Sequence, residues 1–256
     1  MTPARRQALG VAGVLGFLLL LEAAGRAGLI GVLPPVSAVL VTAAGLAVDG
    51  AFLSDVGVTL AACASGLLIA VVTAVPAGLL LGTVPAVERS VRPLVEFLRP
   101  IPSLSLIPLA MFVWTDSQDA KTALVVYTCS WPLLINTMYG LADVDPVAKD
   151  TMRGFGFGPL SILWRVSLPS TAPFIATGVR IAVSVTLIVA VSVELIAGGA
   201  GGIGTFLVQA GSANRVDRML AATIWAGALG LGANALFTAA ERRLFGWHRA
   251  RAGEAT

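Results

Sequence analysis

The sequence is poor in residues that bind metals or form disulfides. Its 256 residues include one histidine and two cysteines. His248 lies in a basic tail, and no cysteine or acidic cluster with metal-ligand spacing surrounds it. Cys63 and Cys129 fall within apolar runs, where a free thiol behaves as a small hydrophobic group. We therefore expect no metal site and no disulfide framework.

Motifs for nucleotide binding and catalysis are also missing. The sequence contains no G-x-x-x-x-G-K-[ST] loop, so we expect no P-loop ATP site and no cofactor on this chain. The glycine-rich segment 198–204 follows a long apolar run instead of a strand, which argues against a dinucleotide-binding loop. We find no Ser, His and Asp set able to support a membrane hydrolase. The sequence thus predicts that the chain is not an enzyme.

What the sequence does contain is apolar. Hydrophobic residues make up 57% of the chain and charged residues only 12%, whereas soluble proteins have about 45–50% and about 25%. This composition predicts an integral membrane protein in contact with the lipid bilayer. We expect the formal charge of +3 to reflect membrane topology, and we expect no nucleic-acid partner.

Six apolar stretches are candidates for membrane spans. A helix needs about 20 apolar residues to cross a hydrocarbon core of about 30 Å. We predict one all-α transmembrane domain over residues 1–256, with spans at 8–25, 56–84, 101–115, 122–141, 173–197 and 219–240. The first stretch also has the basic start and small following residues of a cleavable signal peptide. Because several spans follow, a retained first helix is favoured.

Prolines inside the apolar stretches suggest a translocation pathway. The short span 101–115 contains Pro102 and Pro108, and Trp131 precedes a proline in the middle of the next span. Proline at membrane depth frees backbone carbonyls, which neighbouring helices or a water-filled cavity must satisfy. We therefore place these three residues inside the helix bundle as pathway or gating candidates.

Glu194 is a further pathway or gating candidate, because a carboxylate within a span is costly and usually faces a cavity or a partner. On one straight helix it lies about 21 Å of rise beyond Arg180, so the two cannot pair. We expect Arg180 to extend toward the cytoplasm. Glu194 either lines the pathway or reaches the outer interface, and a gating or structural hydrogen-bonding role suits it better than binding an anion.

The distribution of basic residues predicts the orientation. If both termini are cytoplasmic, the inner segments hold most of the 17 lysines and arginines, and the outer segments hold only Arg26, Lys121, Arg215 and Arg218. Because basic residues collect on the cytoplasmic side, this orientation is favoured. It implies a multi-pass protein of the bacterial inner membrane, with the central polar loop at residues 142–172 in the cytoplasm.

This central loop mixes charged and aromatic residues, which suits a pair of short amphipathic helices. The segment 154–159 predicts a sharp turn between them, because glycine accepts positive φ and proline cannot continue an earlier helix. From these residues alone, the loop could dock on a protein partner or lie on the lipid surface.

The spacing within the loop matches a known pattern: E-A-A, three residues, G, nine residues, I, one residue, and L-P. The matching positions are held by Asp150, Gly156, Val166, Leu168 and Pro169. The two alanines of the pattern are replaced here. The loop nevertheless resembles the EAA loop of permeases in binding-protein-dependent ABC importers. The flanking stretches LRPIPSLSLIPLAMFVW and GVRIAVSVTLIVAVSVELIAG extend the resemblance to the nitrate, sulfonate and taurine branch, over residues 56–247.

The resemblance implies a six-helix type I importer transmembrane domain with a cytoplasmic coupling helix. In this family the loop docks on an ATPase, so that ATP-driven closure of two ATPases moves the membrane helices. The residues that the resemblance assigns to this coupling loop are Lys149, Asp150, Thr151, Met152, Arg153, Gly154, Phe155, Gly156, Leu168 and Pro169.

The resemblance also implies partners. The chain would form the pathway for a small solute, such as nitrate, a sulfonate or taurine, delivered by an extracytoplasmic solute-binding protein. Two cytoplasmic ATPase subunits would hold ATP and Mg²⁺, and a second copy or a sister permease would complete the pathway. The alternative is a self-contained secondary transporter or channel, in which the central loop has only a topological role.

Overall fold

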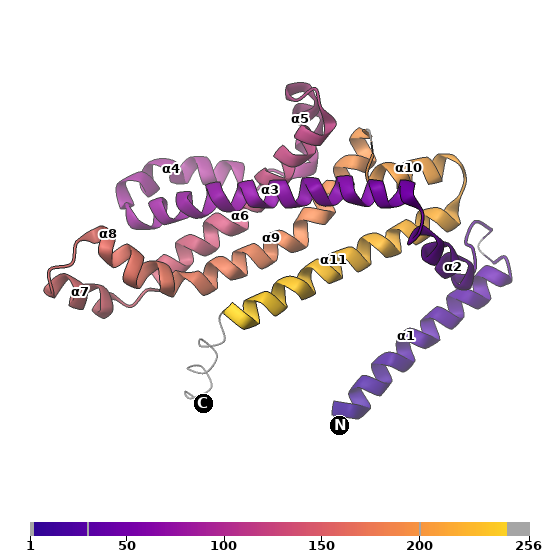
Figure 1. Ribbon diagram of the computed structural model, residues 1–256, viewed down its shortest axis with the longest axis horizontal. Helices are drawn as coiled ribbons and strands as arrows, with labels where there is room; N and C mark the ends of the chain where they lie inside the picture. The colour runs from indigo at the N-terminus through magenta and orange to yellow at the C-terminus, as the bar shows by residue number, and fades with distance from the viewer. Residues whose placement is uncertain (1–2, 30, 200, 245–256) are drawn as a thin grey trace.

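The computed structural model describes residues 3–29, 31–199 and 201–244, and the regular structure of this part of the chain is helical throughout (Figure 1). His248 lies outside the described residues. The long helices are α1 (Pro3–Arg26), α3 (Gly50–Thr83), α6 (Ser117–Ala142), α9 (Leu168–Ala197) and α11 (Val216–Leu244). The shorter elements are α2 (Val36–Leu46), α4 (Pro85–Leu98), η1 (Ser103–Leu106), α5 (Ile107–Val113), α7 (Pro146–Gly154), α8 (Pro159–Ile162), η2 (Leu163–Ser167) and α10 (Ile203–Ser212).

Several helices have the length and composition of membrane spans. The runs that qualify within the described residues are Gly50–Thr83, Pro159–Ala197 and Val216–Arg243. A bent pair, α4 with η1 and α5, provides a fourth if it counts as one span. These runs confirm the predicted all-α membrane fold class. The helices α1 and α6 cover the predicted spans 8–25 and 122–141, although they are not among the runs that qualify.

The predicted span 101–115 begins at a sharp bend. After α4 ends, η1 and α5 continue at 84° to it. With seven residues, α5 rises about 10 Å and cannot cross the membrane alone. Pro102 precedes η1, and Pro108 lies in the first turn of α5, where its missing N–H leaves no hydrogen bond unmade. The break therefore lies at the start of the predicted span, beside Pro102, and Ser103–Val113 continues as one arm of the bent pair.

The predicted span 173–197 begins earlier in the structure. One continuous helical run extends from Pro159 to Ala197 through α8, η2 and α9. Its middle section, η2, is π-helical. It leads into Pro169 and Pro173, and such local adjustments satisfy the carbonyls that proline frees. The second helix of the predicted pair is thus the first part of this long helix.

The core consists of α3, α6 and α9, which pack against one another along their length. Two glycines permit the close approach. A Cβ at Gly66 of α3 would lie 2.6 Å from Val125 Cγ1 of α6, and a Cβ at Gly178 of α9 would lie 3.0 Å from the Pro132 carbonyl oxygen. Small residues let membrane helices approach closely, so van der Waals contacts hold this core together.

A second apolar cluster joins α2, α10 and α11 to the start of α3. Phe52 is fully buried, and its ring meets those of Phe206 and Trp225 edge-on, with centroids 4.9 and 6.1 Å away. The Trp225 indole N–H donates to the Ala43 carbonyl at 2.9 Å. The cluster thereby fixes α2 to one end of the core, while α1 extends away from the bundle (Figure 1).

The two ends of the core differ (Figure 1). At one end, residues 143–167 connect α6 to α9 and carry α7 and α8; we call this region the corner. At the opposite end, which we call the α10 end, α10 follows α9 and contacts α3. The candidate functional residues lie at these two ends and at the bend between α4 and α5.

Candidate functional site

The corner begins with α7, and residues at the start of this helix cap it. Asp145 precedes α7, and its Oδ1 accepts a hydrogen bond from the Val147 N–H at 2.8 Å. This contact satisfies one of the backbone donors that have no partner at a helix start. Pro146 follows in the first turn, where proline is tolerated. The start of α7 is therefore fixed by local residues.

The end of α7 is equally local. The Gly156 N–H donates to the Arg153 carbonyl at 2.9 Å, and the Phe157 N–H donates to the Met152 carbonyl at 3.1 Å. Gly156 has a φ of +82°, which glycine adopts without steric cost. These features form a Schellman motif, and the predicted turn after the first helix is present.

The corner presents charged and aromatic side chains on its surface. Phe155 is 78% exposed, and the exposed Arg153 donates to Asp150 at 2.7 Å. Lys149 turns back, and its Nζ donates to the Leu141 carbonyl at 3.3 Å. An apolar centre with a charged rim is the usual anatomy of a protein-binding surface.

A cavity of about 420 Å³ lies between the corner and the ends of α3 and α6. Lys149, Arg153 and Phe157 contribute to its wall. The Arg165 guanidinium lies 5.4 Å from the centre of the Phe157 ring, within the range of a cation–π interaction. This contact holds one aromatic side chain beside the cavity, whereas Phe155 remains exposed.

The predicted coupling residues fall into two groups. Residues 149–156 form the second half of α7 and the turn after it, so the structure brings them together. Leu168 and Pro169 lie in the first turn of α9, where Leu168 is half-buried and Pro169 is exposed. The final pair of the sequence pattern therefore belongs to the long helix that supports the corner.

Of the pathway candidates, Trp131 has the most distinctive surroundings. It is half-buried, its ring meets Tyr127 edge-on at 5.6 Å, and its buried indole N–H has no hydrogen-bond partner within the described part of the chain. The Tyr127 hydroxyl donates to the Leu98 carbonyl at 2.6 Å, where α4 ends. Pro102 and Pro108 are exposed at the same bend.

Beside this bend lies a cavity of about 540 Å³. Leu81 of α3 and Ile135 of α6 supply apolar wall, and the charged lining residues are Glu88, Arg92, Glu96 and Arg99. Arg92 lies 3.1 Å from Glu88 and is therefore already paired. Trp131 lies one helical turn before Ile135, on the same face of α6. The cavity therefore combines an apolar wall with charges of both signs, and Pro102, Pro108 and Trp131 are not among the residues that line it.

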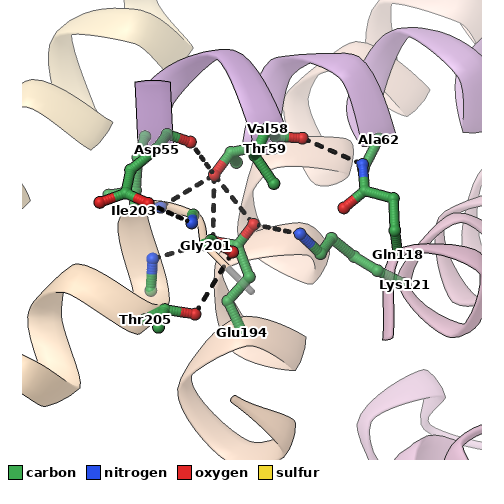
Figure 2. A network of polar contacts seen from close by, with 12 residues as sticks. Asp55, Val58, Thr59, Ala62, Gln118, Lys121, Glu194, Gly201, Ile203 and Thr205 are labelled. Carbon is green, nitrogen blue, oxygen red and sulfur yellow. Dashed lines mark hydrogen bonds and ion pairs between the residues drawn. The ribbon is translucent and has the colours of Figure 1, made fainter. Parts of the chain in front are cut away.

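Glu194 lies at the α10 end and is fully buried (Figure 2). Its Oε1 accepts a hydrogen bond from Lys121 Nζ at 2.6 Å, and Lys121 is only 2% exposed. We had counted Lys121 among the basic residues of the outer segments, and its side chain forms a buried ion pair. Glu194 is closed off from solvent, and its carboxylate is the acceptor at the centre of a hydrogen-bonding network.

Further donors complete the network. Thr59 Oγ1 donates to Glu194 Oε1 at 2.9 Å, and the Gly204 N–H donates to Glu194 Oε2 at 2.8 Å. Thr59 Oγ1 also accepts from the Ile203 N–H at 2.9 Å, and Asp55 Oδ1 accepts from the Gly202 N–H at 2.8 Å. Figure 2 shows these groups converging from α3, α6, α9 and the start of α10.

Sequence reasoning missed three members of this network: Asp55, Thr59 and Lys121. A partial signal existed, because Asp55 and Thr59 are spaced four residues apart and share one helix face. Sequence reasoning also missed the partner of Arg180, whose Nη1 lies 3.7 Å from Glu241 Oε2 near the end of α11. Nothing local in the sequence indicates these tertiary partners.

Comparison with known proteins identifies the family. Residues 66–246 match the family described as binding-protein-dependent transport system inner membrane component. The chain belongs to this family. The permease is 28% identical over 229 residues to the bicarbonate transport system permease protein CmpB of Synechocystis sp., which covers 86% of this chain and 82% of the relative.

Two further relatives are also named as permeases. The permease is 29% identical over 192 residues to the nitrate import permease protein NrtB of Leptolyngbya laminosa, covering 75% of this chain and 68% of the relative. It is 31% identical over 216 residues to a probable ABC transporter permease protein of Brucella melitensis, covering 84% and 87%. The resemblance to the nitrate, sulfonate and taurine branch is thereby confirmed.

Solved structures share the fold. A bacterial ABC transporter involved in the import of alginate has a TM-score of 0.67 at 16% identity, with 94% of this chain and 97% of that chain covered. The inward-facing MetNI methionine ABC transporter has a TM-score of 0.57 at 19% identity, covering 73% and 94%. By its family, the permease is therefore a multi-pass membrane subunit of an ABC importer and a transport protein.

Proposed function

We propose that the permease forms the membrane pathway for a small anion and is driven by ATP and Mg²⁺ bound to two separate cytoplasmic ATPase subunits. The observation that carries the proposal is the corner. It combines a self-contained helix, an exposed phenylalanine and a charged rim at one end of two long helices. A solute-binding protein delivers the anion at the α10 end, and both termini are cytoplasmic.

The coupling role rests on how α7 is built. Its start and end are fixed by Asp145 and Gly156, so local contacts define where the helix begins and ends. Phe155 then provides an apolar anchor, and aromatic residues are favoured at the centre of protein interfaces. Such an anchor suits a groove on an ATPase.

The assembly includes a second copy of this chain or a sister permease. The short helix α5 supports this, because it projects from the bundle in Figure 1 and carries Phe112, which is 87% exposed. Leu109 and Val113 on the same short helix are also exposed. A second permease packed against α5 would bury these apolar groups and close the pathway.

The solute class follows from two observations. Relatives are named as permeases for bicarbonate and for nitrate, which are small anions. The cavity beside the α4–α5 bend contains Arg99 next to the ion pair of Arg92 with Glu88, and a guanidinium group binds planar oxyanions through paired hydrogen bonds. Nitrate, bicarbonate, an alkanesulfonate and the zwitterion taurine are the solutes to test first.

The deciding experiment is purification of the tagged permease from its own host in mild detergent. We expect an ATPase subunit to copurify, to be identified by mass spectrometry, and to hydrolyse ATP. Gly156→Arg should lose this subunit, because the Schellman turn carries the docking surface. Gly28→Arg is the matched control, since Gly28 also has a positive φ and open space around it but lies in the turn after α1.

The copurified binding protein is then screened against the solutes named above. Retention of the ATPase and of ATP-dependent uptake in Gly156→Arg would contradict the docking role. A permease that purifies alone and catalyses gradient-driven flux by itself would instead support the secondary transporter or channel.

A further inference from the structure

The helices α6 and α9 are joined at both of their ends. At one end they are connected by the corner, where the proposed function places the ATPase. At the other end Lys121, in the second turn of α6, and Glu194, in the last turn of α9, form the 2.6 Å ion pair (Figure 2). The two helices therefore form a closed frame: they are joined by the connecting chain at the corner and by an ion pair at the α10 end.

This ion pair fixes the relative positions of the helix ends more than it stabilises the folded protein. Desolvation of two buried charges offsets much of their attraction, so packed apolar residues could often hold the helices equally well. A carboxylate that accepts donors from α3, α6 and α10 at once has few permitted positions, however. The pair therefore fixes how the ends of these helices lie relative to one another.

The same carboxylate fixes the start of α10. The first N–H groups of a helix have no partners within the helix. Here Gly204 donates to Glu194, and Ile203 donates to Thr59, which itself donates to Glu194. A side chain at Gly202 would collide with the Glu194 carboxylate. Displacement of Glu194 therefore displaces the start of α10.

We propose that the Lys121–Glu194 pair is a clamp that transmits movement of the corner to α10. When the ATPases move the corner, α6 and α9 shift as one frame, and the clamp moves α10 with them at the opposite face of the membrane. Lys121 and Glu194 are thus positioning residues for transport. This inference rests on the proposed docking of ATPases at the corner.

The test measures hydrogen–deuterium exchange in the purified permease–ATPase complex, without nucleotide and after trapping with Mg-ATP and vanadate. The two segments compared are 146–154 in α7 and 203–212 in α10. We expect trapping to change exchange in both segments of the unmodified complex.

The informative variant is the double substitution Lys121→Met and Glu194→Gln. It removes both charges together, and the Gln carbonyl still accepts from the Gly204 N–H. We expect the response of 146–154 to remain and the response of 203–212 to be lost. The matched control is Arg215→Met with Asp217→Asn, which removes a more exposed ion pair at the same end and should leave both responses unchanged.

Three outcomes overturn the clamp. The double variant could retain the full response of 203–212, or the control could lose it equally, which would indicate general loosening of this end. An unmodified complex without a response at 146–154 would overturn the docking proposal and the clamp with it, so the two failures are distinguishable.

Thr59→Val provides a second variant if the double substitution loosens the bundle. It removes the hydroxyl that links Ile203 to Glu194 but leaves the ion pair in place. We expect the response of 203–212 to weaken while exchange in α6 and α9 stays as in the unmodified complex. An unchanged response of 203–212 in this variant would also contradict the clamp.

Discussion

The corner and the Glu194 network are opposite in construction, although α6 and α9 connect them. In the corner, the hydrogen bonds that begin and end α7 are made within a few residues along the chain, and Phe155 and Arg153 are exposed. In the network, Lys121 and Thr59 meet Glu194 across separations of 73 and 135 residues, and all three side chains are buried. One region has a surface for a partner, and the other has a fixed internal geometry.

This difference shows what kind of stability each region needs. The corner must keep its shape while a partner binds and dissociates. Helix caps and a glycine with positive φ are sufficient for this. The network must keep four helices in register within an apolar bundle, where an unpaired polar group is costly. Substitutions should therefore have local effects in the corner and global effects in the network.

The largest effect is expected from the single substitution Glu194→Gln. It leaves Lys121 charged and buried without a counter-ion, and breaking a buried ion pair in this way costs about 3–5 kcal/mol. We expect a clear drop in the thermal unfolding temperature of the purified permease in detergent. The double substitution with Lys121→Met should recover most of this loss, because no isolated charge remains.

Equal stability of the single and double variants would contradict the contrast between the Glu194 network and the corner. It would mean that Lys121 finds another partner, or water, when the carboxylate is neutral. The network would then be no more constrained than the corner.

The corner could be predicted from the sequence because its signals are local. Gly156 indicates a backbone with positive φ, and the segment 154–159 indicates the turn, whatever the rest of the chain does. The family pattern places the same residues at the coupling loop. Their docking on an ATPase remains a prediction.

The network could be predicted only in part. Glu194 is conspicuous in an apolar stretch, but its partner is not, because Lys121 lies near the end of a span and resembles an ordinary interfacial charge. The bend after α4 has a local signal, because Pro102 falls at the start of the predicted span 101–115. The contact of the Tyr127 hydroxyl with the Leu98 carbonyl, where α4 ends, has none.

An intermediate effect is expected from Asp145→Ala. Loss of the side-chain cap costs a helix about 1 kcal/mol, and here the loss should stay within α7. We expect faster hydrogen–deuterium exchange over residues 146–154 and weaker ATPase binding, with the unfolding temperature of the bundle almost unchanged. Asp143→Ala is the control, because Asp143 is an exposed neighbour that does not cap α7. Faster exchange throughout α6 and α9 would show that the corner is less independent than its local hydrogen bonds indicate.

The smallest effect on stability is expected from Arg153→Gln. Its ion pair with Asp150 is exposed and lies within one helix, and such pairs contribute about 0.2–1 kcal/mol. The unfolding temperature should therefore hardly change, while ATPase binding should weaken and lose part of its dependence on salt, because a charge on the rim of an interface acts mainly on association. Both quantities can be measured on one preparation, by thermal unfolding and by ATPase titration at two ionic strengths. A large loss of stability with unchanged binding would place Arg153 among the structural residues of the bundle and remove the functional contrast between the two ends of the permease.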